Sequence, residues 1–151
     1  MMAHVRTNPA SANDNNHSIK LLRNFLLATH IGIGFSKKSD PAEAAYEAAS
    51  VARRSSRNDF VLIFNTLHYR PREILPSIYD ILGSSRLIGC SSAGLILSQG
   101  IEMRGVAALT ISSDAIKFGI GAINNLNTQN ILEGGRSLAN RTATSLGQHR
   151  R

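Results

Sequence analysis

The 151-residue sequence predicts an α/β fold: a mixed sheet with an initial β-α-β-α-β parallel unit, followed by an antiparallel hairpin and a terminal helix. Two observations lead to this prediction. Short apolar runs alternate with segments of helical spacing, and right-handed crossovers turn this order into a mainly parallel arrangement. In addition, 42% of the residues are hydrophobic, so the chain can bury one ordinary core and matches the size of one domain.

The first predicted elements are a strand at 31–35 and a helix from Pro41 to about Arg54. The strand alternates apolar side chains with glycine, which suits the close approach of another backbone or a ligand. The helix has Asp40 at its N-cap, a proline at its first position and Glu43 placed to complete a capping box. Its apolar side consists mainly of alanines, so we expect unusually close packing on a sheet.

The apolar run at 59–64 is typical of a central strand that is buried on both faces. Helical spacing of the apolar residues that follow indicates a second helix, which ends at Gly83. Because a proline ring clashes with a preceding helical turn, we expect this helix to begin at Pro76.

A third strand is expected at 86–89, leading into a loop of small residues at 90–94. Strands at 105–111 and 116–123 are expected to form the antiparallel hairpin, because the short polar segment between them is typical of a turn. The region 127–146 has a weakly helical pattern that contains two glycines, so the last helix should depend on tertiary support.

We divide the chain into a polar N-terminal segment at 1–28, a folded domain at 29–147 and a basic tail at 148–151. The N-terminal segment lacks the compact apolar stretch of a signal peptide, and no apolar run is long enough to span a membrane. Cys90 is the single cysteine, which excludes an intrachain disulfide and favours a reducing, cytoplasmic location.

The formal net charge of +7 raises the question of nucleic-acid binding, since Lys and Arg neutralise phosphates. The basic residues are scattered, however, and only 5% of the residues are aromatic, so bases would find few stacking partners. We therefore expect a solvated basic surface, with neither nucleic acid nor membrane as a partner.

Three loops follow the carboxyl ends of the first three predicted strands: 36–39, 65–70 and 90–94. Open α/β sheets bind their ligands at this edge, so we expect the loops to converge on one pocket. The candidate ligand-binding residues are Ser36, Lys37, Ser39, His68, Arg70, Cys90, Ser91, Ser92 and Gly94. The two adjacent serines and nearby backbone N–H groups would hold a carboxylate or another anion, and a basic side chain would complement its charge. A structural turn and merely solvated cations remain the alternatives.

No cofactor or metal is expected. His68 has no neighbouring residues with metal-ligand spacing. Gly32 and Gly34 resemble the start of a dinucleotide fingerprint, but Lys37 stands at the third glycine position. For Cys90, a small apolar filler is favoured over a reactive thiol.

A serine hydrolase is the main enzymatic alternative. Ser91 and Ser92 follow a strand, and each lies in a sequence that lacks one glycine of the nucleophile elbow. The downstream partners are limited to Asp114 and to His149 in the basic tail, which makes an assembled triad implausible. We expect no enzymatic activity.

Several separated segments resemble the N-terminal part of the FIST domain, named for F-box and intracellular signal transduction. They are 32–41 with the alanine-rich helix, 59–64 with His68 and Tyr69, 87–94, 109–114 and 118–121. The resemblance runs from about residue 31 to residue 146. It implies a noncatalytic intracellular sensory module that binds a small polar molecule, such as an amino acid, and passes its occupancy to a signalling partner protein or domain.

The sequence departs from this pattern in two ways. Leu95 stands where relatives often carry an acidic residue, which removes a polar ligand contact. Relatives usually continue with further strands, so a truncated FIST fragment that acts only in protein interaction is the alternative. An uncovered sheet edge in such a fragment would favour a homodimer.

Overall fold

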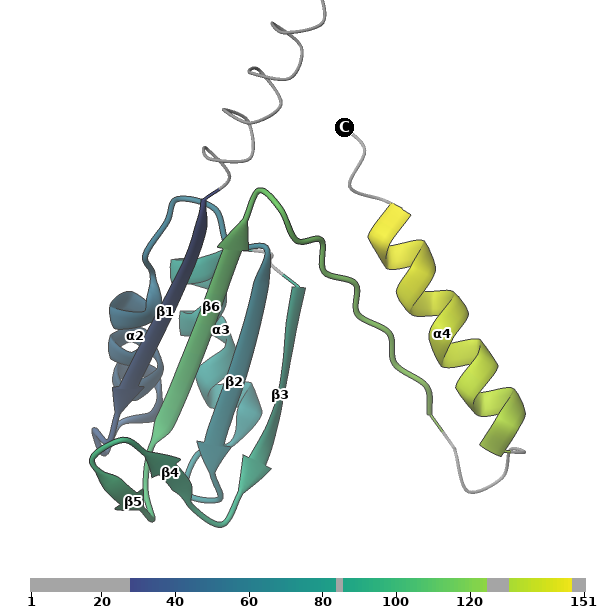
Figure 1. Cartoon of the computed structure of the whole chain (residues 1–151). Helices are drawn as coiled ribbons and strands as arrows, with labels where there is room; N and C mark the ends of the chain where they lie inside the picture. The colour runs from purple at the N-terminus through teal and green to yellow at the C-terminus, as the bar shows by residue number, and fades with distance from the viewer. Residues whose placement is uncertain (1–27, 84–85, 125–130, 148–151) are drawn as a thin grey trace, which may run out of the picture.

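The computed structural model describes residues 28–83, 86–124 and 131–147 (Figure 1). The predicted N-terminal segment, except residue 28, and the basic tail lie outside these ranges. The elements are β1 (Thr29–Ser36), α2 (Pro41–Ala52), β2 (Phe60–Thr66), α3 (Pro71–Leu82), β3 (Arg86–Ser92), β4 (Leu95–Leu97), β5 (Gly100–Glu102), β6 (Val106–Ser113) and α4 (Ile131–Gly147). The predicted α/β fold, with a mixed sheet, an antiparallel hairpin and a terminal helix, is confirmed.

The main sheet has the strand order β1-β6-β2-β3. β2 and β3 are parallel neighbours, whereas β6 pairs antiparallel with β1 on one side and with β2 on the other. The three strands of the initial unit therefore run in the same direction, but β6 separates β1 from β2. β4 and β5 form a separate two-stranded antiparallel sheet.

The predicted hairpin of 105–111 with 116–123 is wrong. β6 lies inside the main sheet, and residues 115–123 have no strand assignment. The antiparallel hairpin is instead β4–β5. Small side chains on β6 fit beneath α2, and the Thr110 hydroxyl donates a hydrogen bond of 2.6 Å to the carbonyl of Ala52 at the helix end. This fit favours a position of β6 beneath α2 over a position in a hairpin at the surface.

Glycines bring β1 and α2 together. The five inward-facing alanines of α2 are fully buried, and a Cβ on Gly32 or Gly34 would overlap the carbonyl oxygen of Ala52 or Ala48. The Asp40 carboxylate accepts a hydrogen bond of 2.9 Å from the Glu43 N–H, as expected for the N-cap. The predicted close packing of an alanine-rich helix on the sheet is confirmed.

α3 begins at Pro71, so the predicted start at Pro76 is wrong. Pro71 occupies the first helical turn, where the missing N–H costs nothing, and Pro76 lies inside the helix with an exposed side chain. A proline at this position removes only one hydrogen bond, to the carbonyl four residues earlier, on the solvent side. The helix ends at Gly83, whose φ of 71° fits the predicted stop.

Both α2 and α3 cover the same face of the main sheet (Figure 1). The strand order explains this, because the steps from β1 to β2 and from β2 to β3 run the same way across the sheet. Right-handed crossovers then place both helices on one side. The prediction that 59–64 is buried on both faces is therefore wrong: Val61 and Ile63 are buried, but Phe64 is 38% exposed.

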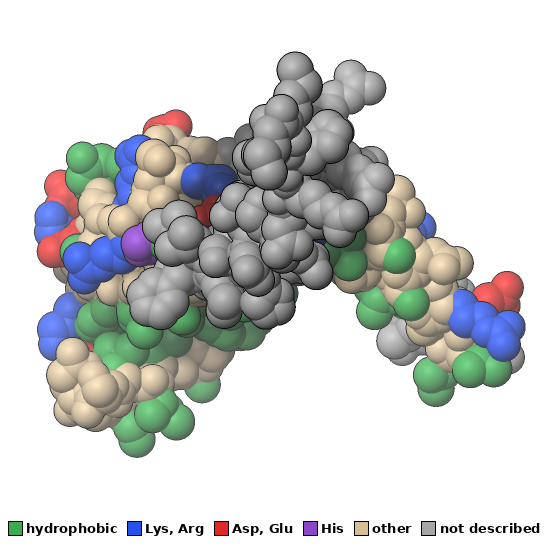
Figure 2. Space-filling model, turned by 45° about the horizontal axis from the view of Figure 1, so that its top comes forward, with side chains coloured by type: hydrophobic (Ala, Val, Ile, Leu, Met, Phe, Trp, Pro, Cys, Tyr) green, Lys and Arg blue, Asp and Glu red, His purple; other side chains and the backbone are tan. Residues whose placement is uncertain are grey.

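We call the other side of the main sheet the open face. Hydrophobic side chains gather on this side of the molecule in Figure 2. Its most exposed members on the main sheet are Ile31, Ile33, Phe64 and Ile88. The open face is thus an apolar surface that none of the described helices covers in the way α2 and α3 cover the opposite face.

α4 stands beside the sheet and packs mainly on the extended segment before it. Gly119 and Gly121 lie against its Thr142, and Arg86 at the start of β3 donates a hydrogen bond of 2.6 Å to the Ser145 carbonyl. The predicted helix at 127–146 is confirmed from Ile131 onward, and residues 127–130 lie outside the described part.

Candidate functional site

The loops after β1, β2 and β3 lie at one edge of the main sheet, the lower edge in Figure 1. β1 and β3 run in the same direction as β2, so their carboxyl ends meet there. The β4–β5 hairpin lies at the same edge. This part of the prediction, that the three strand ends share an edge, agrees with the structure.

Tyr69 connects the first two loops. Its side chain is only 1% exposed, and its hydroxyl donates a hydrogen bond of 2.7 Å to the carbonyl of Lys38. Arg104, which precedes β6, donates to the Tyr69 hydroxyl at 3.2 Å and to the Ser39 carbonyl at 3.1 Å. Ser39 therefore contributes its backbone to this network, which fixes the loops relative to each other.

Ser36 and Lys37 bind protein groups at the end of β1. Ser36 is 3% exposed, and its hydroxyl donates a hydrogen bond of 2.5 Å to the Glu47 carboxylate on α2. Lys37 forms an ion pair of 3.2 Å with Glu102 on β5. Both side chains join β1 to its neighbours.

His68 and Arg70 lie on the loop between β2 and α3. The His68 Nδ1 is 3.3 Å from the hydroxyl of Thr66, which also accepts a hydrogen bond of 3.1 Å from the Gly105 N–H. Arg70 occupies the N-cap position of α3, where it makes no side-chain capping bond and is exposed. Arg70 therefore stands at the start of α3 without contributing a side-chain cap.

Ser91 and Ser92 lie on opposite faces of the sheet. β3 pairs with β2 through Ser92, so the predicted strand end at Gly89 is wrong, and the two serines belong to a strand rather than to one turn. Side chains alternate along a strand. Ser91 faces the helices and accepts a hydrogen bond of 3.0 Å from the Asn65 amide, whereas the Ser92 hydroxyl donates 2.8 Å to the Gly94 carbonyl.

A small cleft lies between β2, β3 and the first turns of α3, and we call it the α3 cleft. Its volume is about 140 Å³, and its lining residues are Ile63, Asn65, Pro71, Ile74, Leu75, Leu87, Gly89, Cys90 and Ser91. The polar side-chain groups of this lining are the Asn65 amide and the Ser91 hydroxyl, whereas strand alternation directs the Cys90 thiol to the other side of the sheet. The rest of the lining is apolar. Of the residues selected from the sequence, only Cys90 and Ser91 line this cleft.

Asn65 holds the polar side of the α3 cleft in place. It is 3% exposed, and its amide also donates a hydrogen bond of 2.7 Å to the Tyr69 carbonyl. Ser91 can return a hydrogen bond to the Asn65 carbonyl oxygen at 3.3 Å. Because the amide is already bonded to protein groups, the exposed Ser91 hydroxyl is the side-chain group best able to exchange its partner for a ligand.

A second hollow lies on the open face, beneath the β4–β5 hairpin, and we call it the hairpin groove. Its volume is about 490 Å³. Predicted site residues Cys90, Ser92 and Gly94 line it together with mostly apolar side chains, including Ile33, Phe64 and Leu109. Leu95, which departs from the expected acidic residue, is 7% exposed and adds to this apolar lining. The groove suits an apolar surface better than a polar ligand.

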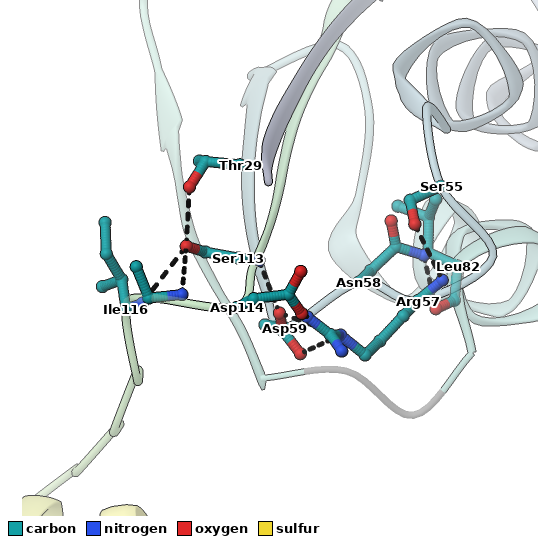
Figure 3. Close-up of polar contacts among 10 residues, drawn as sticks. Thr29, Ser55, Arg57, Asn58, Asp59, Leu82, Ser113, Asp114 and Ile116 are labelled. Atoms are coloured by element: carbon teal, nitrogen blue, oxygen red, sulfur yellow. Dashed lines mark hydrogen bonds and ion pairs between the residues drawn. The ribbon is translucent and has the colours of Figure 1, made fainter. Parts of the chain in front are cut away.

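A cluster of charges at the opposite end of the sheet binds the start of β2 to the end of β6 (Figure 3). Arg57 contacts Asp59 at 2.9 Å and Asp114 at 3.0 Å. The Asp59 carboxylate also accepts a hydrogen bond of 2.8 Å from the Ser113 N–H. The hydrogen bond from Arg57 lowers the pKa of Asp114 below its ordinary value, and the same bond raises the pKa of Arg57.

The described residues do not assemble the triad that the hydrolase alternative requires. Asp114 is engaged by Arg57 at the edge of the sheet remote from Ser91, and His149 lies outside the described ranges. The hydrogen-bond partner of Ser91 is an amide, which cannot act as a general base. Within the described residues, no three His, Cys, Asp or Glu side chains are grouped so that they could hold a metal ion.

Sequence reasoning missed three residues that organise this edge. Asn65 interrupts an apolar run at the end of a strand, and this break in pattern is a usable signal for a polar role. Tyr69 carries no signal in the sequence beyond the family resemblance. Arg104 lies 35 residues from Tyr69 along the chain, and no local pattern connects the two.

The fold and this edge define a class of protein: an α/β module with a small cleft at the carboxyl ends of two parallel strands. The sequence model of the FIST N domain matches residues 59–150, which is more than half of the chain. The chain therefore belongs to the FIST N domain family, and membership is consistent with a sensory role in signal transduction. No curated protein matches the sequence significantly. Among the described helices, none has the length and apolar character needed to cross a membrane.

Proposed function

We propose that this FIST N domain is a noncatalytic sensory module that binds a small polar molecule, such as an amino acid, in the α3 cleft. A signalling partner protein or domain would detect the occupied state. The observation that supports this proposal most strongly is the position of Ser91. Its exposed hydroxyl and the buried Asn65 amide are the two oxygen- or nitrogen-bearing side chains in a cleft with otherwise apolar walls.

The size and charge of the α3 cleft limit the ligand. A volume of about 140 Å³ corresponds to about five water molecules at roughly 30 Å³ each, which is well below the volume of a drug-sized pocket. The cleft includes Pro71, the first residue of α3, so a ligand would lie beside the positive end of the helix dipole. Arg70 and Arg72 flank Pro71 in the sequence and are exposed, and exposed Glu73 in the same turn offsets part of their positive charge. These features favour a short aliphatic amino acid or a small carboxylate.

The hydrogen bonds around the cleft offer a path from ligand to surface. A ligand that takes the Ser91 hydroxyl would change its bond to Asn65, which is also bonded to the backbone of Tyr69. Tyr69 in turn contacts the loop after β1 and Arg104. Binding would bias this network toward one arrangement and alter the surface that a partner contacts.

The test is a ligand screen on the full chain with two matched variants. Thermal unfolding is measured with aliphatic amino acids and small carboxylates, and titration calorimetry follows for any that raise the transition temperature. We expect a saturable shift that Ser91→Ala removes and Ser92→Ala leaves intact. Ser92 is the matched control because it is the adjacent serine on the opposite face.

Two results would contradict the proposed ligand site, and a third would contradict the noncatalytic assignment. One is a cooperative transition that no ligand shifts, which would favour the alternative that this chain acts only in protein interaction. The other is ligand binding that Ser92→Ala abolishes and Ser91→Ala does not, which would move the site to the hairpin groove. Release of product from a model ester, lost in Ser91→Ala, would overturn the noncatalytic assignment.

A further inference from the structure

We propose that the ligand of the α3 cleft is a short aliphatic monocarboxylate, recognised through its carboxylate, rather than an amino acid. This assignment rests on the proposed function, since it takes the α3 cleft as the binding site, and it narrows the class of ligand. Two observations support it. One is the direction of the hydrogen bonds between Asn65 and Ser91, and the other is that no acidic side chain belongs to the described lining of the cleft.

The Asn65 amide is held in one orientation. Its nitrogen lies 2.7 Å from the Tyr69 carbonyl oxygen and 3.1 Å from the Thr66 carbonyl oxygen. Carbonyl oxygens accept hydrogen bonds and cannot donate them, so turning the amide over would place oxygen against oxygen. Asn65 is only 3% exposed, so water could not compensate for this loss. The NH₂ side of the amide therefore faces the two carbonyls.

This orientation decides the direction of the bond to Ser91. The Asn65 nitrogen lies 3.0 Å from the Ser91 hydroxyl oxygen, whereas the reverse bond, from Ser91 to the Asn65 oxygen, is longer at 3.3 Å. A Ser91 hydroxyl that accepts from Asn65 keeps its own proton for another partner. Because Ser91 is exposed, that partner can be a ligand. The cleft therefore selects an acceptor, and a carboxylate makes a stronger, charge-assisted hydrogen bond than a neutral acceptor.

A bound acceptor would also change the bonds of Asn65. The amide has two protons for three acceptors: the two carbonyls and the Ser91 oxygen. A ligand that takes the Ser91 proton makes the Ser91 oxygen a better acceptor, because linked hydrogen bonds polarise one another. One amide proton is then drawn toward Ser91. The side-chain NH₂ group of Asn65 is therefore a reporter of how the ligand binds.

The lining gives an ammonium group no counter-charge. Apart from the Asn65 amide and the Ser91 hydroxyl, the side chains that enter the cleft from its described lining are apolar. An ammonium that leaves water without a paired carboxylate loses much of its hydration energy. The amino group of an α-amino acid is attached next to the carboxylate, so it would enter the cleft with it, beside the positive end of the α3 dipole. An amino group should therefore weaken binding.

Glu73 is the acidic residue in the first turn of α3. It is exposed and does not belong to the described lining of the cleft. Ion pairs with exposed carboxylates contribute little, because water and salt screen them. Arg70 and Arg72, which flank Pro71, are exposed in the same region and would repel an ammonium. Glu73 therefore does not replace the missing counter-charge.

The experiment is a nuclear magnetic resonance titration of the full chain with isovalerate, valine and isobutylamine. Valine is isovalerate with an added amino group, and isobutylamine has an ammonium group in place of the carboxylate. The signals to follow are the Ser91 backbone amide and the Asn65 side-chain NH₂ group. We expect saturable shifts of both with isovalerate, at least tenfold weaker binding of valine, and no saturable shift with isobutylamine. Ser91→Ala should remove the binding of isovalerate.

A pair of variants tests the role of charge directly. Leu75 is half-buried on α3 and lines the cleft. Leu75→Asp and Leu75→Asn introduce side chains of the same shape that differ in charge. We expect isovalerate to bind Leu75→Asp at least tenfold more weakly than Leu75→Asn, since the new carboxylate repels the carboxylate of the ligand. Circular dichroism establishes that both variants are folded, and the titration of the unchanged chain tests the assignment even if they are not.

The outcomes separate this assignment from the proposed function. Valine that binds as tightly as isovalerate, with Ser91→Ala removing both, overturns the carboxylate assignment and leaves the α3 cleft as the ligand site. A Glu73→Gln variant that loses the binding of valine would show that Glu73 does supply the counter-charge, and it would overturn the assignment in the same way. Binding of none of the three probes also overturns it, whereas the wider ligand screen with Ser91→Ala and Ser92→Ala decides on the site itself.

Discussion

Two extended segments of this chain meet a helix in a similar way. β1 places Gly32 and Gly34 against the backbone of α2, and the segment before α4 places Gly119 and Gly121 against that helix. In both regions the glycines are two residues apart, so both face the helix from one side of an extended backbone. Side chains larger than hydrogen would collide with the helix in each case.

The two regions differ in what surrounds this contact. β1 pairs with β6 over eight residues, and the inward side of α2 consists of fully buried alanines. Residues 115–123 have no strand assignment, and α4 keeps Ile131 78% exposed and Leu138 38% exposed. Close glycine packing alone therefore does not create a core. It does so where strand pairing and small helix residues bring two backbones together.

The largest effect is expected from Gly34→Ala. The new Cβ would overlap the carbonyl oxygen of Ala48, and neither backbone can move without disturbing the sheet. We expect a loss of about 3 kcal/mol or more in the free energy of unfolding, at the upper end of overpacking effects. Urea denaturation measures it. A loss below that of Gly119→Ala would show that the β1–α2 contact is not the tighter one.

An intermediate effect is expected from Thr110→Val, which keeps the shape of the side chain and removes its hydroxyl. The Ala52 carbonyl would lose a hydrogen bond of 2.6 Å in a buried position, so the expected loss in unfolding free energy is about 1–2 kcal/mol. The comparison is with Thr144→Val on α4, whose hydroxyl bonds the exposed helix backbone and whose loss should change stability little. Equal losses for the two variants would contradict the proposed difference in burial.

A smaller effect is expected from Gly119→Ala. Its Cβ would lie 2.6 Å from the Thr142 carbonyl and 2.6 Å from the Leu146 Cγ, but Leu146 is a partly exposed side chain that can change rotamer. We expect a loss of about 1 kcal/mol by urea denaturation. Gly135→Ala is the control within α4, because nothing lies near its Cβ and alanine should raise helix stability by up to about 1 kcal/mol.

The smallest effect is expected from Asp114→Asn, at the point where the chain leaves β6 for the second region. The pKa of Asp114 in the folded protein lies below its ordinary value of 3.8, because Arg57 donates a hydrogen bond to the carboxylate. The ionised carboxylate therefore stabilises the fold above pH 3.8, and this contribution is lost as the pH falls through the lowered pKa. We expect a slight decrease in Tm at neutral pH and none in strong acid. An equal decrease in Tm at both pH values would contradict this origin.

Local sequence patterns predicted the helices and strands better than they predicted which of these elements lie side by side. The capping residues of α2, its alanine side and the apolar run of β2 follow from spacing alone. The place of β6 does not, because its pairing with β1 joins residues at least 70 positions apart, such as Ile33 and Leu109. The predicted hairpin rested on the nearest turn-like segment, whereas burial beneath α2 decided the outcome. The apolar run at 59–64 also suggested a strand buried on both faces, although both crossovers turn the same way and place both helices on one face.

The candidate site shows the same limit at the scale of single residues. The edge of the sheet was predictable, because parallel strands share their carboxyl ends. The side to which each residue points was not, because it depends on where β3 stops. A three-residue extension beyond Gly89 turned one predicted serine pair into two serines with separate surroundings. Lys37 and Ser36 were selected for their chemistry, but Glu102 and Glu47 come from distant positions and bind them.

The alternation at the end of β3 means that one peptide group joins two surfaces. Ser91 belongs to the α3 cleft, Ser92 to the hairpin groove, and the rise between adjacent residues of a strand is only about 3.3 Å. A rotation of this peptide plane that accommodates a molecule on one side necessarily displaces atoms on the other. Binding of a small molecule on one face of the sheet would then change the shape of the surface on the other face, without any long-range rearrangement of the domain.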